Sequence, residues 1–192
     1  WVQAEVRAGR IRWKKFTCGV DTAYSSKSPD TISFIFQGIA IDRRLITLKE
    51  KVYNNRDLET PIAPSDTAVK LVGFLEQCRS EWGFAKDVYV DNADQATMTE
   101  LKKYKRLHGC LYNFWDAYKK FGIIDRIKLQ LGWIQQGCYL VVDECENHLA
   151  EMEKYSWKED KDEPEDRNDH TINANQYSWI PYKHLIGFEE EA

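Results

Sequence analysis

The chain has 192 residues, of which 43% are hydrophobic and 13% aromatic, and its formal net charge is −4. This length and composition suit one globular domain with a sizeable core, and no apolar run approaches the ~20 residues that span a membrane. The acidic balance argues against a uniformly basic nucleic-acid-binding surface. Basic residues nevertheless gather in 102–106 and 119–128, and a local basic surface can coexist with a negative total.

The cysteines and the N-terminus bear on the compartment and on the extent of the chain. Five cysteines, an odd number, contain no C-x-x-C pair. We therefore expect buried free thiols in a reducing compartment, and no zinc ribbon. The N-terminus shows no signal peptide and no starting Met, from which we expect a processed chain or a fragment of a longer one.

The first half of the chain predicts an entering segment, three strands and a helix. We expect a linker over 1–13, a strand over 14–21, a turn over 24–30, and an antiparallel pair over 31–41 and 44–53. A helix begins at 64–66 and runs to Trp82. Its predicted buried stripe consists of Val69, Val72, Phe74 and Leu75.

The second half alternates short strands with helices. We expect strands over 87–91, 110–115 and 138–142, and helices over 95–105, 122–135, 145–157 and 169–180. The predicted buried stripe of 122–135 consists of Ile124, Ile127, Leu131 and Ile134. Strands that alternate with helices after an antiparallel meander predict an α/β fold, with a mixed sheet flanked by helices on both faces. A ribonuclease-H-like fold has this arrangement, although several other α/β folds fit the same order.

Three separated segments carry candidate metal ligands. Asp21 and Asp91 each close an apolar run that predicts a buried strand, and ligands bind open α/β sheets at the carboxyl ends of such strands. On the last helix, Asp169, His170 and Asn173 share one face, because residues three and four apart are neighbours there. Taken alone, each aspartate is equally well a turn former or a helix cap. Together they predict a site for Mg²⁺ or Mn²⁺.

Asn173 stands where this arrangement would need a third carboxylate. Cleavage of a phosphodiester by two metal ions requires several negative oxygen ligands that hold the ions ~4 Å apart. The carbonyl oxygen of an asparagine can occupy a coordination position, but it neutralises no charge. We therefore expect weaker binding of at least one ion and a large loss of rate.

Four segments together resemble the nuclease domain of a tailed-bacteriophage terminase large subunit. The resemblance covers nearly all of 16–179, and it is carried by GVDTAYSSKSPDT, VDNADQATMTEL, IDRIKLQLGWIQQG with the following CYLVVDECENHLAEMEKYSW, and NDHTINANQYSW. Its most specific part is an E-x-x-x-Y-x-W segment from Glu151 to Trp157, then a charged loop, then a helix that begins with Asn-Asp-His.

The resemblance implies a ribonuclease-H-like, metal-dependent endonuclease that cuts concatemeric viral double-stranded DNA during genome packaging, with two Mg²⁺ or Mn²⁺ ions. It matches Asp21 and Asp91 to the family's first two metal-binding aspartates, His170 to the helix histidine and Asn173 to the third aspartate. Asp169 is a conceivable substitute ligand. Asn173 then indicates either an introduced Asp-to-Asn change or a natural variant with a shifted ligand set, and its Asp-like shape favours the first.

The resemblance also implies partners: double-stranded DNA, the terminase ATPase domain, the small terminase subunit and the portal protein, in the host cytoplasm, with the isolated domain a monomer. The chain has no GxxxxGK[ST] phosphate loop. We therefore expect 1–13 to be the linker from a missing N-terminal ATPase domain and 14–192 to be the nuclease domain. The basic residues expected to contact DNA are Lys102, Lys103, Lys105, Arg106, Lys119, Lys120, Arg126 and Lys128.

Two other functions remain open at this point. The first is a catalytically silent DNA- or partner-binding module of the same fold, which Asn173 favours. The second is a related ribonuclease-H-like enzyme such as a transposase or junction resolvase, which the terminase-like tail segment disfavours. In the nuclease, we expect the acidic loop 158–167 to limit access of DNA by like-charge repulsion.

Overall fold

The computed structural model describes residues 1–22, 31–54, 59–60, 62–91, 93–154 and 169–188. In this part of the chain, six strands form one sheet in the order β5-β4-β1-β2-β3-β6. The strands are β1 (Trp13–Thr22), β2 (Thr31–Ala40), β3 (Leu45–Asn54), β4 (Asp87–Val90), β5 (Asn113–Asp116) and β6 (Tyr139–Val141). The helices are α1 (Val2–Arg7), α2 (Pro64–Glu81), α3 (Gln95–His108), α4 (Ile123–Gln135), α5 (Glu146–Lys154), α6 (His170–Trp179) and the 3-10 helix η2 (Ile180–Leu185).

The sheet is mixed. Strands β1, β2 and β3 form an antiparallel meander. On one side β4 runs parallel to β1 and β5 runs parallel to β4, and on the other side β6 runs parallel to β3. Parallel neighbours need crossover connections, and α2, α3 and α4 lie in the connections that lead to β4, β5 and β6.

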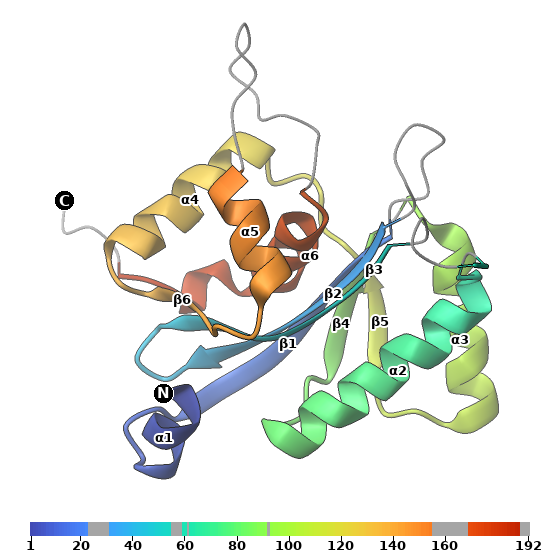
Figure 1. The fold of residues 1–192 in the computed structure, drawn as a ribbon, viewed down its shortest axis with the longest axis horizontal. Helices are drawn as coiled ribbons and strands as arrows, with labels where there is room; N and C mark the ends of the chain where they lie inside the picture. The colour runs from blue at the N-terminus through green and yellow to red at the C-terminus, as the bar shows by residue number, and fades with distance from the viewer. Residues whose placement is uncertain (23–30, 55–58, 61, 92, 155–168, 189–192) are drawn as a thin grey trace, which may run out of the picture.

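Helices cover both faces of the sheet, as the sequence predicts. Figure 1 shows α2 and α3 on one side and α4, α5 and α6 on the other. The first face carries the larger apolar core, in which Cys18 and Val20 of β1 pack with Leu71 of α2 and Leu101 of α3. On the second face, Ile39 and Leu45 belong to a smaller apolar cluster. Its centre is an edge-to-face contact between Trp133 of α4 and Trp179 of α6, with ring centroids 4.8 Å apart.

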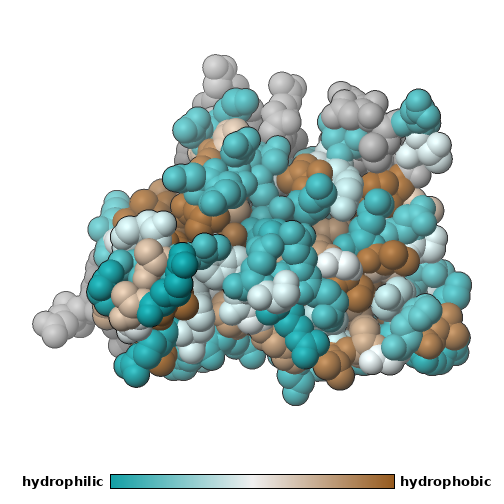
Figure 2. Space-filling model, turned by 60° about the horizontal axis from the view of Figure 1, so that its bottom comes forward, coloured by the Kyte–Doolittle hydropathy of each residue, from teal (hydrophilic) through white to brown (hydrophobic). Residues whose placement is uncertain are grey.

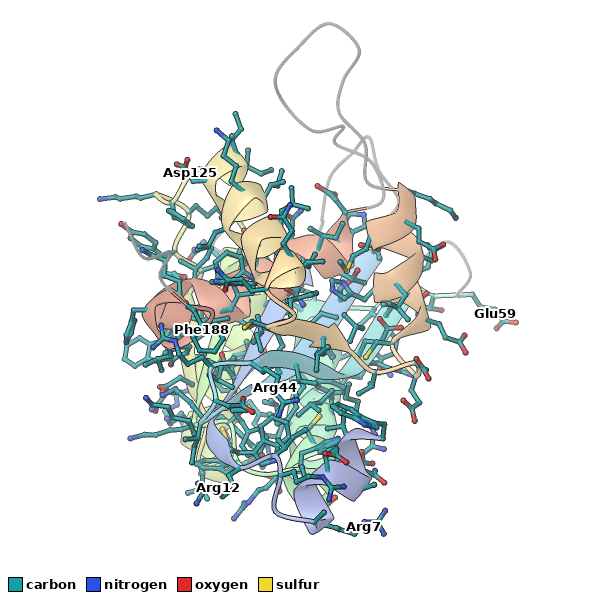
Figure 3. All side chains as sticks on the ribbon, turned by 90° about the vertical axis from the view of Figure 1, so that its left-hand side faces the viewer. Arg7, Arg12, Arg44, Glu59, Asp125 and Phe188 are labelled. Atoms are coloured by element: carbon teal, nitrogen blue, oxygen red, sulfur yellow. The ribbon has the colours of Figure 1, made fainter. Side chains whose placement is uncertain are left out.

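The segment expected as a linker contains regular structure. Residues 2–7 form α1, and both Val2 and Ile11 belong to the larger core. Figure 3 shows Arg7 and Arg12 at one end of the molecule and Asp125, at the start of α4, at the opposite end. The chain therefore enters β1 at the end of the molecule opposite to the start of α4.

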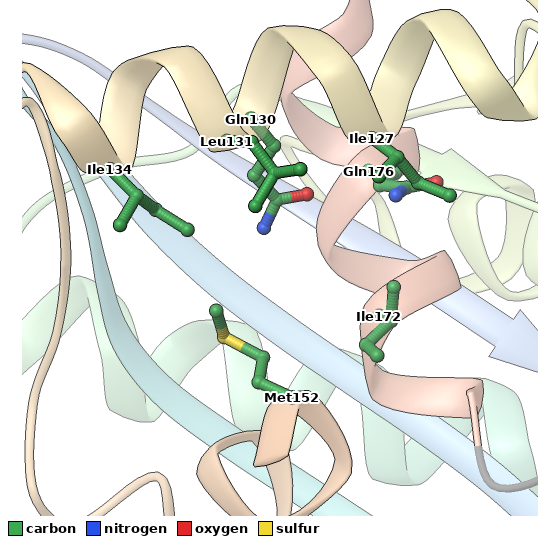
Figure 4. Close-up of a pocket in the computed structure, with 7 residues that line it drawn as sticks. All are labelled: Ile127, Gln130, Leu131, Ile134, Met152, Ile172 and Gln176. Carbon is green, nitrogen blue, oxygen red and sulfur yellow. The ribbon is translucent and has the colours of Figure 1, made fainter. Parts of the chain in front are cut away.

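Two of the predicted buried stripes are wrong in part. Val69 of α2 is 57% exposed, whereas Val72, Phe74 and Leu75 are buried as expected. On α4, Leu131 is 50% exposed and Ile134 is 39% exposed, because the helix turns Trp133 toward Trp179 instead. The face of α4 that carries Leu131 and Ile134 lines a cavity of about 160 Å³ between α4, α5 and α6 (Figure 4). The lining residues are Ile127, Gln130, Leu131, Ile134, Met152, Ile172 and Gln176.

All five cysteines are free thiols, and four are buried, as predicted. On the face shown in Figure 2, apolar residues are interspersed with polar ones. Among the described residues, no helix is long and apolar enough to cross a membrane. The predicted turn 24–30 and the acidic loop 158–167 lie outside the described residues.

Candidate active site

Helix α6 packs directly against the backbone of β1. Alternate strand residues point to the same face, and Thr17, Gly19 and Asp21 face α6. The hydroxyl of Thr17 donates a hydrogen bond of 2.8 Å to the carbonyl oxygen of Ser178. One step along, a Cβ on Gly19 would lie only 1.8 Å from the carbonyl oxygen of Ala174. The glycine is therefore required for the close approach that brings α6 onto the strand.

Asp21 is the next β1 residue on this face, and it lies against the first residue of α6. Its carboxylate oxygen Oδ2 is 3.1 Å from Nδ1 of His170. Asp21 is 3% exposed, and this burial raises its pKa to about 7, although the hydrogen bond from His170 opposes the rise and the negative charge of Asp91 adds to it. Burial of the imidazole disfavours its charged form, but the bond and charge of Asp21 outweigh this effect, so the pKa of His170 is raised.

Asp91 is the neighbour of Asp21 on the adjacent strand. Strands β1 and β4 pair in parallel up to Val20 and Val90, and the backbone N–H of Asp91 continues the ladder with a bond of 2.9 Å to the carbonyl of Val20. In this register the next pair is Asp21 and Asp91. Residues paired on neighbouring strands share a face, so both carboxylates point toward α6.

Two side chains hold the Asp91 carboxylate. Nζ of Lys119 lies 2.5 Å from its Oδ1, and the hydroxyl of Tyr177 lies 3.5 Å from its Oδ2. Lys119 follows β5, whose continuation remains beside β4 through a bond from the N–H of Ala117 to the carbonyl of Val90. An ammonium group therefore stands beside the Asp91 carboxylate.

The N-terminal half of α6 places Asn173 beside this pair. His170, Asn173 and Tyr177 lie three and four residues apart and so share one helix face. His170 contacts Asp21 and Tyr177 contacts Asp91, and the half-buried Asn173 lies between them on the helix. Asp169 occupies the N-cap position of α6 and is buried, and its carbonyl accepts the backbone N–H of Asn173.

The donor set suits a divalent cation but is short of negative charge. Within the described residues, no group of three or more His, Cys, Asp or Glu side chains is arranged to hold a metal ion. Asp21 and Asp91 offer hard carboxylate oxygens, and Asn173 offers an amide in place of a third. His170 is hydrogen-bonded to Asp21, so it orients that carboxylate. The residues fit one cation held mainly by the two aspartates better than they fit two.

The candidate DNA-contacting residues fall into separate groups. Lys119 and Lys120 are exposed and follow β5 at the edge where Asp91 lies. Lys105 instead donates 2.7 Å bonds to the carbonyl of Tyr112 and to Asn113. Arg126 is buried and donates to Gln176. The remaining members are exposed: Lys102, Lys103 and Arg106 on α3, and Lys128 on α4.

A second polar cluster, on the other flank of α6, was not predicted. The amide of Asn175 donates to Thr47 and Tyr139 at 3.0 Å each and lies 3.2 Å from Nε2 of His148. The same nitrogen of His148 is 2.7 Å from the Tyr139 hydroxyl. A signal was present, because HTINANQYSW has polar residues on every side, and a helix of that kind is unusual unless its polar groups find partners.

Comparisons with known proteins find similarity to solved structures only. No family model matches the sequence, and no curated protein matches it. The large terminase of a thermophilic bacteriophage is similar in structure, with a TM-score of 0.70 at 21% identity over 91% of this chain and 41% of that one. This chain therefore spans about two fifths of the length of that terminase.

Two isolated nuclease domains are also similar. The large terminase nuclease from thermophilic phage G20c, in a structure with bound magnesium, gives a TM-score of 0.56 at 14% identity over 86% of this chain and 80% of that one. The human cytomegalovirus terminase nuclease domain gives 0.53 at 12% identity over 85% and 81%. Over most of its length, the chain thus has the ribonuclease-H-like fold of terminase large subunit nuclease domains.

Proposed function

We propose that this chain is the metal-dependent endonuclease domain of a viral DNA-packaging terminase, with its activity reduced by Asn173. The observation that carries the proposal is the in-register pair of buried aspartates, Asp21 and Asp91, beneath a helix that presents His170 and Asn173. One nuclease of the same fold has been solved both with bound magnesium and with bound cobalt, and this supports a divalent cation as the cofactor.

In this proposal Asp21, Asp91 and the carbonyl oxygen of Asn173 would hold Mg²⁺ or Mn²⁺. A bound ion supplies activated water and stabilises the leaving oxygen of the phosphodiester. His170 keeps Asp21 oriented through its 3.1 Å hydrogen bond. Burial that raises the pKa of Asp21 to about 7 keeps that group partly protonated at neutral pH, so binding of a cation must displace a proton.

Lys119 and the nearby Lys120 would approach the phosphates of double-stranded DNA. Lys119 neutralises Asp91, and its ammonium group would be available for a phosphate if Asp91 held a cation instead. The exposed basic residues of α3 and Lys128 are further candidate contacts, whereas the bonds of Lys105 and the burial of Arg126 disfavour these two. We also propose, from the likeness to terminases, a preceding ATPase domain joined through 1–13, the small subunit and portal as partners, and a site of action in the host cell.

The test is nicking of supercoiled plasmid in millimolar Mn²⁺ by this chain and by its Asn173→Asp variant. We expect the variant to cut faster by on the order of 100-fold, because it restores a negative ligand. The double variant Asp21→Asn/Asn173→Asp is the control and should not cut. Equal cutting by the parent and Asn173→Asp would overturn the role of position 173 and direct attention to Asp169.

A silent binding module is the second candidate function, and Asn173 is the observation that favours it. If neither the parent nor Asn173→Asp cuts DNA or gains thermal stability from Mn²⁺, while both still bind DNA, the silent module replaces the nuclease. Cutting by Asn173→Asp would exclude it for the active form.

A further inference from the structure

Glu151 opens the E-x-x-x-Y-x-W segment, yet it contacts neither of the buried aspartates. It lies on α5, and one of its carboxylate oxygens accepts three hydrogen bonds from the start of α6. The backbone N–H and the hydroxyl of Thr171 donate to Oε2 at 2.8 Å and 2.5 Å, and the backbone N–H of Ile172 donates at 3.3 Å. Thr171 directly follows His170, and Ile172 directly precedes Asn173.

These bonds satisfy the first turn of α6 in place of a local cap. The first N–H groups of a helix have no partner within the helix, and a side chain at the N-cap usually accepts one of them. Asp169 holds that position in α6 but makes no side-chain cap hydrogen bond. Glu151 supplies the acceptor from another helix, and its negative charge also suits the positive end of the helix dipole.

Helix α5 is itself held by a carboxylate from the sheet. Glu50 of β3 accepts the backbone N–H groups of Asn147 and His148, each at 2.8 Å. From this same first turn of α5, Nδ1 of His148 lies 3.0 Å from the hydroxyl of Thr171. Two carboxylate caps in series, Glu50 and Glu151, thus connect β3 to α5 and α5 to the turn of α6 that bears the candidate ligands.

We infer that Glu151 is a positioning residue for the nuclease site. It fixes the height and rotation of the first turn of α6, so that His170 meets Asp21 and position 173 faces the two aspartates. This inference rests on the proposed function, since it concerns the same metal site. Residues that orient metal ligands from outside the coordination sphere typically change metal affinity or activity by about 10–100-fold when they are replaced.

The experiment compares Glu151→Gln and Glu151→Ala in the Asn173→Asp background. The matched control is Glu153→Gln, an exposed glutamate two residues along the same helix. We expect Glu151→Gln to raise the Mn²⁺ concentration for half-maximal nicking and to lower kcat, together by about 10-fold, and Glu151→Ala to do so more strongly. The KM for DNA should stay unchanged, because the carboxylate of Glu151 is bonded to Thr171 and Ile172 and is no proposed DNA contact, and Glu153→Gln should match its parent.

A structural role without a positioning role gives a different result. If both Glu151 variants melt at lower temperature but keep the Mn²⁺ dependence and kcat of the parent, the inference is overturned. Hydrogen exchange of the α6 amides without metal gives a readout that does not need cleavage. Faster exchange in 170–173 for Glu151→Gln, with β1 unchanged, supports the cap, and unchanged exchange there contradicts it. Absence of cutting by the Asn173→Asp parent would count against the nuclease proposal itself, and the exchange result would still decide the cap.

Discussion

The two flanks of α6 hold buried polar groups in opposite ways. On the flank toward β3 and α5, Asn175 joins His148, Tyr139 and Thr47 in a network of neutral hydrogen bonds. Burial there lowers the pKa of His148 to about 4, so its ring stays uncharged. On the flank toward β1 and β4, two carboxylates share a buried position.

The difference separates groups that stabilise the helix from groups whose buried charges oppose folding. Neutral donors and acceptors that find each other in the interior contribute to stability, whereas buried like charges oppose it. Asp21 and Asp91 lie in register on adjacent strands, and burial together with the neighbouring charge raises the pKa of Asp21 to about 7. Perturbed carboxylates of this kind are typical of functional sites.

Asp21→Asn should break the comparison most strongly, because it removes one of the two buried carboxylates from the second flank. A carboxyl whose pKa is raised in the folded state favours folding when protonated, and this contribution is lost as pH rises from about 4 to about 7. Above pH 7 the variant should therefore be more stable than the metal-free parent, by up to about 4 kcal/mol. Urea unfolding at pH 8 measures the gain.

The same variant at pH 4 is the control, because Asp21 is then largely protonated and the gain should nearly vanish. Addition of Mn²⁺ at pH 8 should stabilise the parent more than Asp21→Asn. A gain of equal size at both pH values would show that ionisation of Asp21 has no part in it.

Gly19→Ala should disturb both flanks, because it moves the helix that separates them. The new methyl group would overlap the carbonyl oxygen of Ala174, at 1.8 Å, and a backbone atom cannot rotate away. We expect a loss of roughly 3 kcal/mol or more in the free energy of unfolding. Gly73→Ala, on α2, is the control, since a Cβ there meets no atom within 4 Å and a helical Gly-to-Ala change gains up to about 1 kcal/mol. Similar unfolding curves for the two variants would contradict the close helix–strand contact.

Lowering the pH should reduce the contribution that the neutral flank, through His148, makes to the free energy of unfolding. A histidine whose pKa is lowered by burial favours folding above its ordinary pKa of 6.5, and this contribution is lost as pH falls toward about 4. The expected loss is about 3 kcal/mol. Because Asp21 changes stability in the opposite direction over the same range, the measurement belongs in the Asp21→Asn background. Unfolding between pH 7 and pH 4 should show the loss, and adding His148→Gln should flatten the curve. An equal slope with and without His148 would assign it to other groups.

The sequence was sufficient for those parts of the fold that depend on local pattern. Apolar runs that end in Asp21 and Asp91 predicted two strands of one sheet, and the three-residue spacing of His170 and Asn173 predicted a shared helix face. The mixed α/β sheet with helices on both sides is confirmed. The role of each of these residues in metal binding remains a prediction.

Features that depend on distant partners could not be predicted in this way. Leu131 and Ile134 fit the helical period of α4, but the rotation of that helix is set by the contact of Trp133 with Trp179 of α6. The buried position of Asn175 can be explained only by its hydrogen-bond partners Thr47 and His148, which come from β3 and α5. Lys119 was expected on the DNA surface, and its contact with Asp91 follows only from the pairing of β4 with β5.

The contact between β1 and α6 has a consequence for how the helix can move. Three successive contacts join Thr17 to Ser178, Gly19 to Ala174, and Asp21 to His170. Each advances two residues along the strand, about 6.6 Å, and four along the helix, about 6 Å. Because these two lengths are nearly equal, the same strand–helix contact can repeat along the whole of the packed segment. Sliding by a fraction of a turn would break all three contacts together, and sliding by a whole turn would bring Thr17 or Asp21 to the close contact that requires a glycine. The helix therefore has one preferred position along β1.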